Sequence, residues 1–293
     1  MPLAVAGCGL RHRHPLPATE AHYEVGEAYQ AGGIYRYPRT QFDYDATGLA
    51  TVITAHAPLT ADGEAYDATA LVGAHQTLQL PAIVRVTNLE SGRQILLRLN
   101  DRGPDLRGRM LALSRRAAEL LGPGTEPGVL RVRVQVEDAS SRQLAATLAG
   151  GDAPALPILV APAGDVVAEP LLPPSGTGSE EGRFASVRNV AAAPVMAQVT
   201  ASLPLRLPEQ VTQLEVRPTA LYVDLGDFSR QRYADLLARR MARLGAQVST
   251  SYGAPRGQAF RVRVGPLSGL SDADATLDQA IAAGVVDARI IVD

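Results

Sequence analysis

Apolar and polar residues alternate with a period of two in several stretches between about residues 23 and 137. Alternation of this kind is typical of strands, whose successive side chains point to opposite faces, and Gly, Pro, Asn and Asp between the stretches indicate turns. The alternating stretches are residues 83–86, 95–99 and 130–136. A helical stretch follows Ser114 and ends before Gly122. We therefore predict a mainly β domain with a helix near its end.

Residues 219–293 show a mixture of the strand period and the helical period. Ser229 and Ser271 are the expected N-caps of two helices, which end at Gly245 and Gly284. The expected strands are 221–225, 247–252, 259–264 and 286–292. The order βαββαβ predicts a small α+β domain with one sheet and two helices on one face.

The stretch between these zones lacks either period. Residues 151–218 hold ten of the 21 prolines, with much Ala, Gly and Ser. A composition of this kind is typical of an extended linker. We expect a residual leader and tail at 1–22, a barrel domain at 23–137, a flexible linker at 138–218 and a second domain at 219–293.

Composition and charge narrow the function classes. The chain of 293 residues has a formal net charge of −2, unlike proteins that coat nucleic acid. All of its basic residues are arginine, so chemistry that needs a lysine is excluded. The single cysteine, Cys8, excludes an intrachain disulfide and a cysteine-rich zinc site. No apolar run reaches the length of a membrane span.

The densest group of polar residues lies in the first domain. A turn-rich loop at 60–67 contains Glu64, His75 follows eleven residues after it, and Asp101 ends a strand before a Gly-Pro loop. Carboxylates and a histidine at loop ends could supply a general acid, a base and a positioning group. The same residues are also common turn formers, and spacing alone leaves both interpretations open.

The stretch from Tyr23 to Val136 is similar to the rare lipoprotein A family of bacterial septal lytic transglycosylases. TADGEAYD resembles the family's TANGExYD, and the further matching segments are YEVGEAYQAGGIYRYP, ALVGAHQTLQLPAIVRVTNLESGR, LNDRGP and SRRAAELLG. The resemblance implies a double-psi β-barrel. It also implies cleavage between N-acetylmuramic acid and N-acetylglucosamine without water, giving 1,6-anhydro ends.

The resemblance carries roles to individual residues. Asp101 would be the general acid that then acts as base, Glu64 would stabilise developing positive charge or share the proton transfer, and His75 would orient one of them. The residues expected to contact the sugar directly, or to support the side chains that do, are Asn100, Arg102, Thr60 and Tyr66. Neither a cofactor nor a metal is implied.

Two departures keep a second hypothesis open. The family has an aromatic segment and a Phe-His-Gly loop where this chain has the shorter stretch from Thr51 to His56, and Asp105 replaces an aromatic residue. Sugar rings pack on aromatic faces, so this loss favours a non-catalytic septal glycan-binding lipoprotein with a relict barrel. A third hypothesis is a structural tether between membrane and wall.

The last 75 residues resemble the sporulation-related repeat, a domain that binds septal peptidoglycan. The resemblance implies binding of glycan strands stripped of stem peptides, which are enriched at division sites. The expected exposed sheet residues are Tyr222, Asp224, Arg261 and Arg263, with Asp224 where the family often has Gln. An RNA-recognition fold shares the strand order but needs aromatic stacking residues on the sheet, and we expect no nucleic-acid partner.

The amino terminus is consistent with an envelope protein. Val5, Ala6 and Gly7 precede Cys8, as small residues do in the lipobox of bacterial lipoprotein signals. We expect lipidation of Cys8, anchoring to the outer membrane on the periplasmic side, and concentration at the septum. Peptidoglycan is the expected partner, with divisome proteins as further partners.

Overall fold

The computed structural model describes residues 20–151, 206–253 and 257–293. Cys8 and most of the expected linker, residues 152–205, lie outside the described residues, so the expectations for them stay predictions. Among the helices that are described, none has both the length and the apolar character needed to cross a bilayer.

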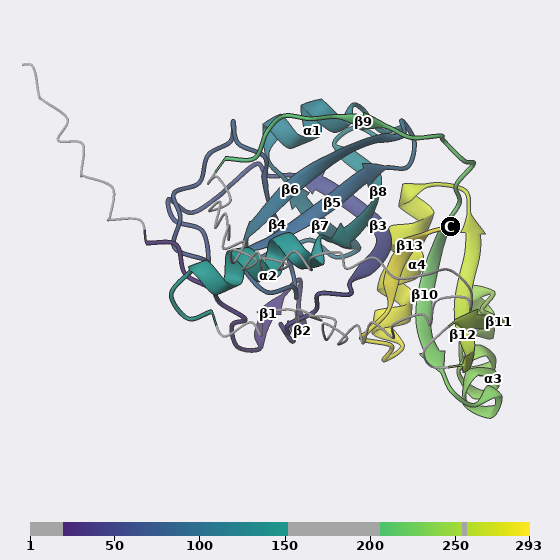
Figure 1. Cartoon of the computed structure of the whole chain (residues 1–293). Helices are drawn as coiled ribbons and strands as arrows, with labels where there is room; N and C mark the ends of the chain where they lie inside the picture. Colours follow the sequence, from purple (N-terminus) through teal and green to yellow (C-terminus); the bar gives the residue numbers. More distant parts are fainter. Residues whose placement is uncertain (1–19, 152–205, 254–256) are drawn as a thin grey trace, which may run out of the picture. The chain divides into compact units, whose positions relative to one another are not determined.

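Six strands close into a barrel in the first domain (Figure 1). They are β3 (Asp45–Val52), β4 (Val72–His75), β5 (Ala82–Asn88), β6 (Arg93–Asp101), β7 (Arg109–Leu113) and β8 (Val129–Val136). Their order is β4-β7-β3-β8-β5-β6, and a further pairing of β4 with β6 closes the ring. The pairs β3–β7 and β4–β6 are parallel, and the others are antiparallel. This architecture confirms the predicted double-psi β-barrel.

The barrel interior follows from the alternation in the sequence. Leu97, Leu99, Val132 and Val134 have no exposed surface, while the residues between them in β8 face outward or are half-buried. Burial of each such side chain contributes about 1.5–3 kcal/mol. The apolar face of each strand therefore forms one core and leaves the strand ends to carry polar groups.

The predicted helix in this domain is α1 (Arg115–Leu121). The Ser114 hydroxyl accepts the N–H of Ala117 at 3.2 Å, which satisfies one of the free donors of the first turn. Gly122 follows with a φ of 79°, a conformation that glycine adopts without a steric cost. The predicted cap and end of this helix are both confirmed.

The folded part of the first domain extends beyond residue 137. Helix α2 (Asp138–Thr147) begins where the linker was expected, and its Leu144 and Ala145 are buried. The Ser141 hydroxyl also bonds the backbone N–H and carbonyl of Ile83 in β5, each at 3.0 Å. The expected boundary is therefore too early, because this helix buries small residues that give a weak apolar stripe.

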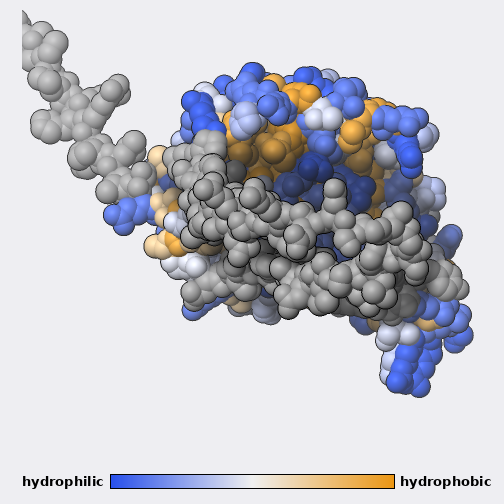
Figure 2. Space-filling model, viewed as in Figure 1, coloured by the Kyte–Doolittle hydropathy of each residue, from blue (hydrophilic) through white to orange (hydrophobic). Residues whose placement is uncertain are grey.

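A second departure from the expected linker lies after residue 205. Strand β9 (Thr212–Gln213) pairs with β6, and Leu207 joins the apolar core of the barrel. Figure 2 shows apolar surface over the region of α1 and β9. The exposed apolar side chains of this segment are Val211, Leu214 and Val216.

A short hairpin precedes the barrel. It consists of β1 (Tyr29–Ala31) and β2 (Ile34–Arg36), joined through Gly32 and Gly33. Both glycines have positive φ, 58° and 75°, which favours glycine at each turn position.

The second domain has the predicted order βαββαβ. Its elements are β10 (Leu221–Phe228), α3 (Gln231–Arg240), a 3₁₀ turn (Ala242–Leu244), β11 (Gln247–Gly253), β12 (Gly257–Leu267), α4 (Leu270–Ala282) and β13 (Arg289–Val292). The four strands form an antiparallel sheet in the order β11-β12-β10-β13. Both helices pack against the central strands, and buried Leu221, Val223 and Val262 lie in this core.

Candidate functional site

The barrel topology places two of the predicted site residues at the adjacent ends of neighbouring strands. His75 ends β4 and Asp101 ends β6, and these neighbouring strands run parallel. Their carboxyl ends therefore meet. The residue opposite Asp101 in the register is Ala74, so the side chain of His75 points to the other face of the sheet.

Asp101 is the half-buried carboxyl of this region. One of its oxygens accepts the backbone N–H of Ala61 at 3.0 Å and that of Arg102 at 2.8 Å. Burial raises the pKa of Asp101 above its usual value, and the two backbone hydrogen bonds oppose that shift. A carboxyl that keeps its proton at higher pH and still reaches solvent is suited to general acid catalysis.

Glu64 is buried and is tied to β6. It forms an ion pair with Arg98, and the Asn100 side-chain amide donates to Glu64 Oε2 at 3.0 Å. Both partners lie on the strand that ends at Asp101. Glu64 therefore fixes the loop at 60–64 against β6, and this loop supplies the N–H that Asp101 accepts.

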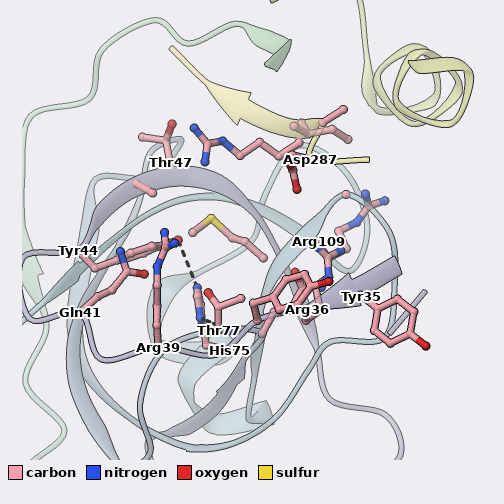
Figure 3. Close-up of a pocket in the computed structure, with 18 residues that line it drawn as sticks. Tyr35, Arg36, Arg39, Gln41, Tyr44, Thr47, His75, Thr77, Arg109 and Asp287 are labelled. Carbon is pink, nitrogen blue, oxygen red and sulfur yellow. Dashed lines mark hydrogen bonds between the residues drawn. The ribbon is translucent and has the colours of Figure 1, made fainter. Parts of the chain in front are cut away.

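His75 is buried and neutral. Its Nδ1 accepts the N–H groups of Thr77 at 3.2 Å and Leu78 at 3.1 Å, which places the ring proton on Nε2. Nε2 lies 3.3 Å from the Tyr44 hydroxyl, the contact drawn as a dashed line in Figure 3. Burial lowers the pKa of His75 to about 3, with a smaller contribution from nearby arginines.

The expectation that His75 orients a carboxylate requires correction. Both ring nitrogens have other partners, and neither Glu64 nor Asp101 is among them. The physical reason is strand alternation, which gives the position opposite Asp101 to Ala74. The structure thus brings the loop of Glu64 to Asp101 and leaves the imidazole on another face.

The residues expected to contact sugar differ in their exposure. Thr60 and Asn100 are buried, at 5% and 2% exposed, and bond the carboxyl groups of Asp62 and Glu64, so they are not on the surface as substrate-binding residues would be. Arg102 is half-buried, and its guanidinium donates to the carbonyls of Leu78 and Val25. Tyr66 is also half-buried.

Two residues near the site were missed by the sequence reasoning. His56 is exposed, and its ring stacks on Tyr66 with centroids 3.8 Å apart. Asp62 is fully buried beside Glu64, and burial, followed by the charge of Glu64, raises its pKa to about 7. The signal for Asp62 was present in TADGEAYD, where an acid stands in place of the Asn of TANGExYD.

In the second domain, three of the four expected residues are half-buried on the sheet. The Arg263 guanidinium lies 4.4 Å above the Tyr222 ring and pairs with Asp293 at 2.5 Å. Arg261 pairs with Asp227 at 2.9 Å. These pairs and the aromatic ring form a polar surface opposite the helices.

Asp224 was expected to be exposed, and this prediction is wrong. Only 2% of its surface is accessible. It lies on β10, which has a neighbouring strand on each side, and Arg289 from β13 donates to its Oδ2 at 2.8 Å. The central position of the strand and the arginine on the next strand together cover the carboxyl.

Within the described ranges, no three His, Cys, Asp or Glu side chains are grouped in a way that could hold a metal ion.

Comparison with known proteins adds to this geometry. A family model described as "Lytic transglycolase" matches residues 45–134, and a model described as "SPOR domain" matches residues 218–288. The first match covers the whole barrel from β3 to β8 except its last residues. The second covers β10, β11, β12 and both helices of the C-terminal domain and ends just before β13.

The chain is similar to curated proteins named endolytic peptidoglycan transglycosylase RlpA. It is 31% identical over 225 residues to the one from Pseudomonas aeruginosa strain UCBPP-PA14, which covers 76% of this chain and 63% of that protein. It is 44% identical over 114 residues to the one from Yersinia pestis and 42% over 110 residues to the one from Escherichia coli K12. The chain thus spans less than two thirds of the length of these relatives. Both domain models and both folds agree that the chain carries a lytic transglycolase double-psi barrel followed by a SPOR domain, and over 76% of its length it is similar to RlpA.

Proposed function

We propose that the protein is a lytic transglycosylase that cleaves the bond between N-acetylmuramic acid and N-acetylglucosamine in glycan strands lacking stem peptides. Asp101 carries the proposal, because it is a half-buried carboxyl at the end of β6 with a pKa raised by burial. The name of the relatives, endolytic peptidoglycan transglycosylase, supports the same reaction.

In the proposed reaction the carboxyl of Asp101 acts first as a general acid and then as a general base. Asp101 in its acid form donates its proton to the glycosidic oxygen, and the bond from that oxygen to C1 of the muramic residue breaks. The carboxylate then removes the proton of the 6-hydroxyl of the same residue, whose oxygen bonds to C1. The proton is back on Asp101, no water is consumed, and the product has a 1,6-anhydro end.

The surrounding residues support this use of Asp101. The ion pair of Glu64 with Arg98 favours a holding role for Glu64, which fixes the loop that contributes the Ala61 N–H to Asp101. Tyr66 and Arg102, which are both half-buried, are the residues that we assign to sugar contact. His75 holds the turn after β4 through its bonds to backbone amides.

The SPOR domain is proposed to hold the enzyme on its substrate. Tyr222, Arg261 and Arg263 offer an aromatic ring and guanidinium groups to a sugar polymer. Binding of strands without stem peptides would concentrate the protein at the division septum. Lipidation of Cys8 would anchor it to the outer membrane, with divisome proteins as further partners.

A non-catalytic glycan-binding role is the second candidate. The observation that favours it is the stretch from Thr51 to His56, which contains no Trp, Tyr or Phe to pack against a sugar ring. In this case the barrel would bind glycan without cleaving it.

One experiment distinguishes the catalytic from the non-catalytic candidate. The full chain and its Asp101→Asn variant are incubated with peptidoglycan stripped of stem peptides, and soluble products are analysed by mass spectrometry. We expect the parent to release anhydro-muramic products and the variant to lose at least about a hundredfold in rate, as removal of a general acid does. Asp43→Asn, an exposed aspartate of the same domain, is the matched control and should cleave normally. Intact binding without products from the parent would favour the second candidate.

A further inference from the structure

Two buried carboxyl groups lie close to a single arginine side chain beside the site. Arg98 pairs with Glu64, and its Nη2 is 3.9 Å from Asp62 Oδ2. Asp62 has no exposed surface, and the side chain of Arg98 is 3% exposed. Two negative charges that share one positive charge away from water repel each other strongly, so such a pair favours a proton on one of its members.

The hydrogen bonds favour Asp62 as the carboxyl that holds the proton. Glu64 has both oxygens occupied, one by Arg98 and the other by Asn100 at 3.0 Å. Asp62 Oδ1 accepts from the Thr60 hydroxyl at 2.7 Å and from the Glu64 N–H at 3.3 Å. Asp62 Oδ2 is buried without a hydrogen-bond partner in the described part of the chain. An oxygen in this position is stabilised as the hydroxyl of a neutral carboxyl rather than as an anion.

We propose that Asp62 is a positioning residue whose proton keeps Glu64 paired with Arg98, and so keeps the loop at 60–64 in place against Asp101. This inference rests on the proposed function, because its catalytic consequence requires Asp101 to be the acid. Loss of the proton would place a second anion beside Glu64. The loop would then loosen from β6, and the Ala61 N–H that Asp101 accepts would move with it.

The electrostatics agree with this assignment. Burial and the charge of Glu64 raise the pKa of Asp62 to about 7, while the Thr60 hydroxyl, Arg98 and the Glu64 N–H oppose the shift. The proton is therefore lost as the pH rises through neutrality. An asparagine side chain has nearly the same shape as that of Asp62 but cannot become negatively charged. The Asp62→Asn variant should therefore keep the loop at 60–64 against β6 at every pH.

The test uses Asp62→Asn in the full chain, with Asp67→Asn as the matched control. Asp67 is an exposed aspartate three positions after Glu64 and accepts from the hydroxyl and N–H of Thr69. The measured quantity is kcat/KM on stripped glycan from pH 5.5 to 8.5, expressed as the ratio of variant to parent. This ratio cancels the titration of Asp101 and of the substrate.

We expect the ratio for Asp62→Asn to rise about tenfold between pH 6 and pH 8, as a group that titrates near neutrality requires. The ratio for Asp67→Asn should stay constant. A constant ratio for Asp62→Asn, together with an inactive Asp101→Asn protein, would overturn the inference and leave the proposed function standing. An active Asp101→Asn protein would instead contradict the proposed function.

A readout without catalysis keeps the inference testable if the glycan is not cleaved. A raised pKa means that the native state holds the proton more tightly than the unfolded chain, so Asp62 favours folding at low pH and this contribution is lost as the pH rises towards 7. The Tm of Asp62→Asn should therefore increase relative to the parent between pH 5 and pH 8. If Asp62→Asn does not fold, carboxyl carbon-13 NMR of the Asp101→Asn protein should still show an aspartate that titrates near pH 7. A constant Tm difference, or the absence of that titration, overturns the inference.

Discussion

His75 illustrates how a residue can match a functional motif and yet serve the fold. Its position in the sequence suggested a partner for a carboxylate, whereas its ring accepts two backbone N–H groups and lies near the Tyr44 hydroxyl. A pattern gives the type and position of a residue. Which face its side chain occupies depends on the register of β4 against β6, including an irregularity between Gly73 and Ala74 that the sequence does not reveal.

The stability of the His75→Leu variant should depend on pH. The pKa of His75 is about 3 in the folded state, below its ordinary 6.5, so the unfolded chain binds a proton first and the native state loses stability as pH falls from 6.5 towards 3. At pH 7 the variant should lose about 2–4 kcal/mol, because the part-buried N–H of Thr77 and the buried N–H of Leu78 lose their acceptor. The loss should shrink by about 1–3 kcal/mol at pH 4.5, measured by urea unfolding. His56→Leu, at an exposed histidine, is the control; an equal loss for His75→Leu at both pH values would contradict this account.

At the scale of elements, caps that are supported by tertiary contacts were predicted better than caps at exposed helix starts. The Ser114 cap of α1 is present, with its hydroxyl also donating to the Ala70 carbonyl at 2.7 Å. The expected caps Ser229 and Ser271 do not form caps, since α3 begins after Arg230 and α4 after Gly269. Gly245, in contrast, ends the 3₁₀ turn after α3 in the left-handed conformation, as predicted.

Removal of the α1 cap should therefore cost more than removal of either exposed serine. Ser114→Ala is expected to lower the free energy of unfolding by about 1–2 kcal/mol, since the N–H of Ala117 and the carbonyl of Ala70 lose their partner in a buried position. Ser229→Ala is the control and should stay within about 0.5 kcal/mol. Chemical denaturation measures both, and equal effects would show that the Ser114 hydroxyl does not stabilise the helix.

The extra elements of the first domain show the limit of periodicity as a signal. Helix α2 buries Ser141 and Ala145, which are too small to give a clear apolar stripe, and β9 is a pair of residues whose pairing with β6 comes from a distant part of the chain. Long-range pairing of this kind leaves little trace in local sequence. The strands expected at 83–86, 95–99 and 130–136 lie in β5, β6 and β8, and these stretches and the βαββαβ order, by contrast, could be predicted from local periodicity.

For the molecule as a whole, we propose that the barrel cleaves glycan and that the SPOR sheet binds it. Tyr222→Ala should weaken sedimentation with stripped sacculi by about tenfold, the equivalent of roughly 1.4 kcal/mol, because the ring and the Arg263 guanidinium stacked on it form one surface. Tyr233→Ala removes an exposed tyrosine from α3, on the helical side, and should bind like the parent. Equal binding by the two variants would place the glycan elsewhere.

The candidate site was predictable in its residue types and less so in its arrangement. Asp101 and the loop of Glu64 come together as expected, through the Ala61 N–H and the bonds of Glu64 to β6. The buried acid Asp62 was not anticipated as a separate group, because burial and a shared arginine are properties of the folded barrel.

We propose that Asp101 regains its proton from the muramic 6-hydroxyl rather than from water. Digestion of stripped glycan in water enriched in oxygen-18, followed by mass spectrometry, tests it directly. The account predicts 1,6-anhydro ends without the heavy isotope, and no such products from Asp101→Asn. Reducing ends that carry oxygen-18, or undiminished products from the variant, would contradict it.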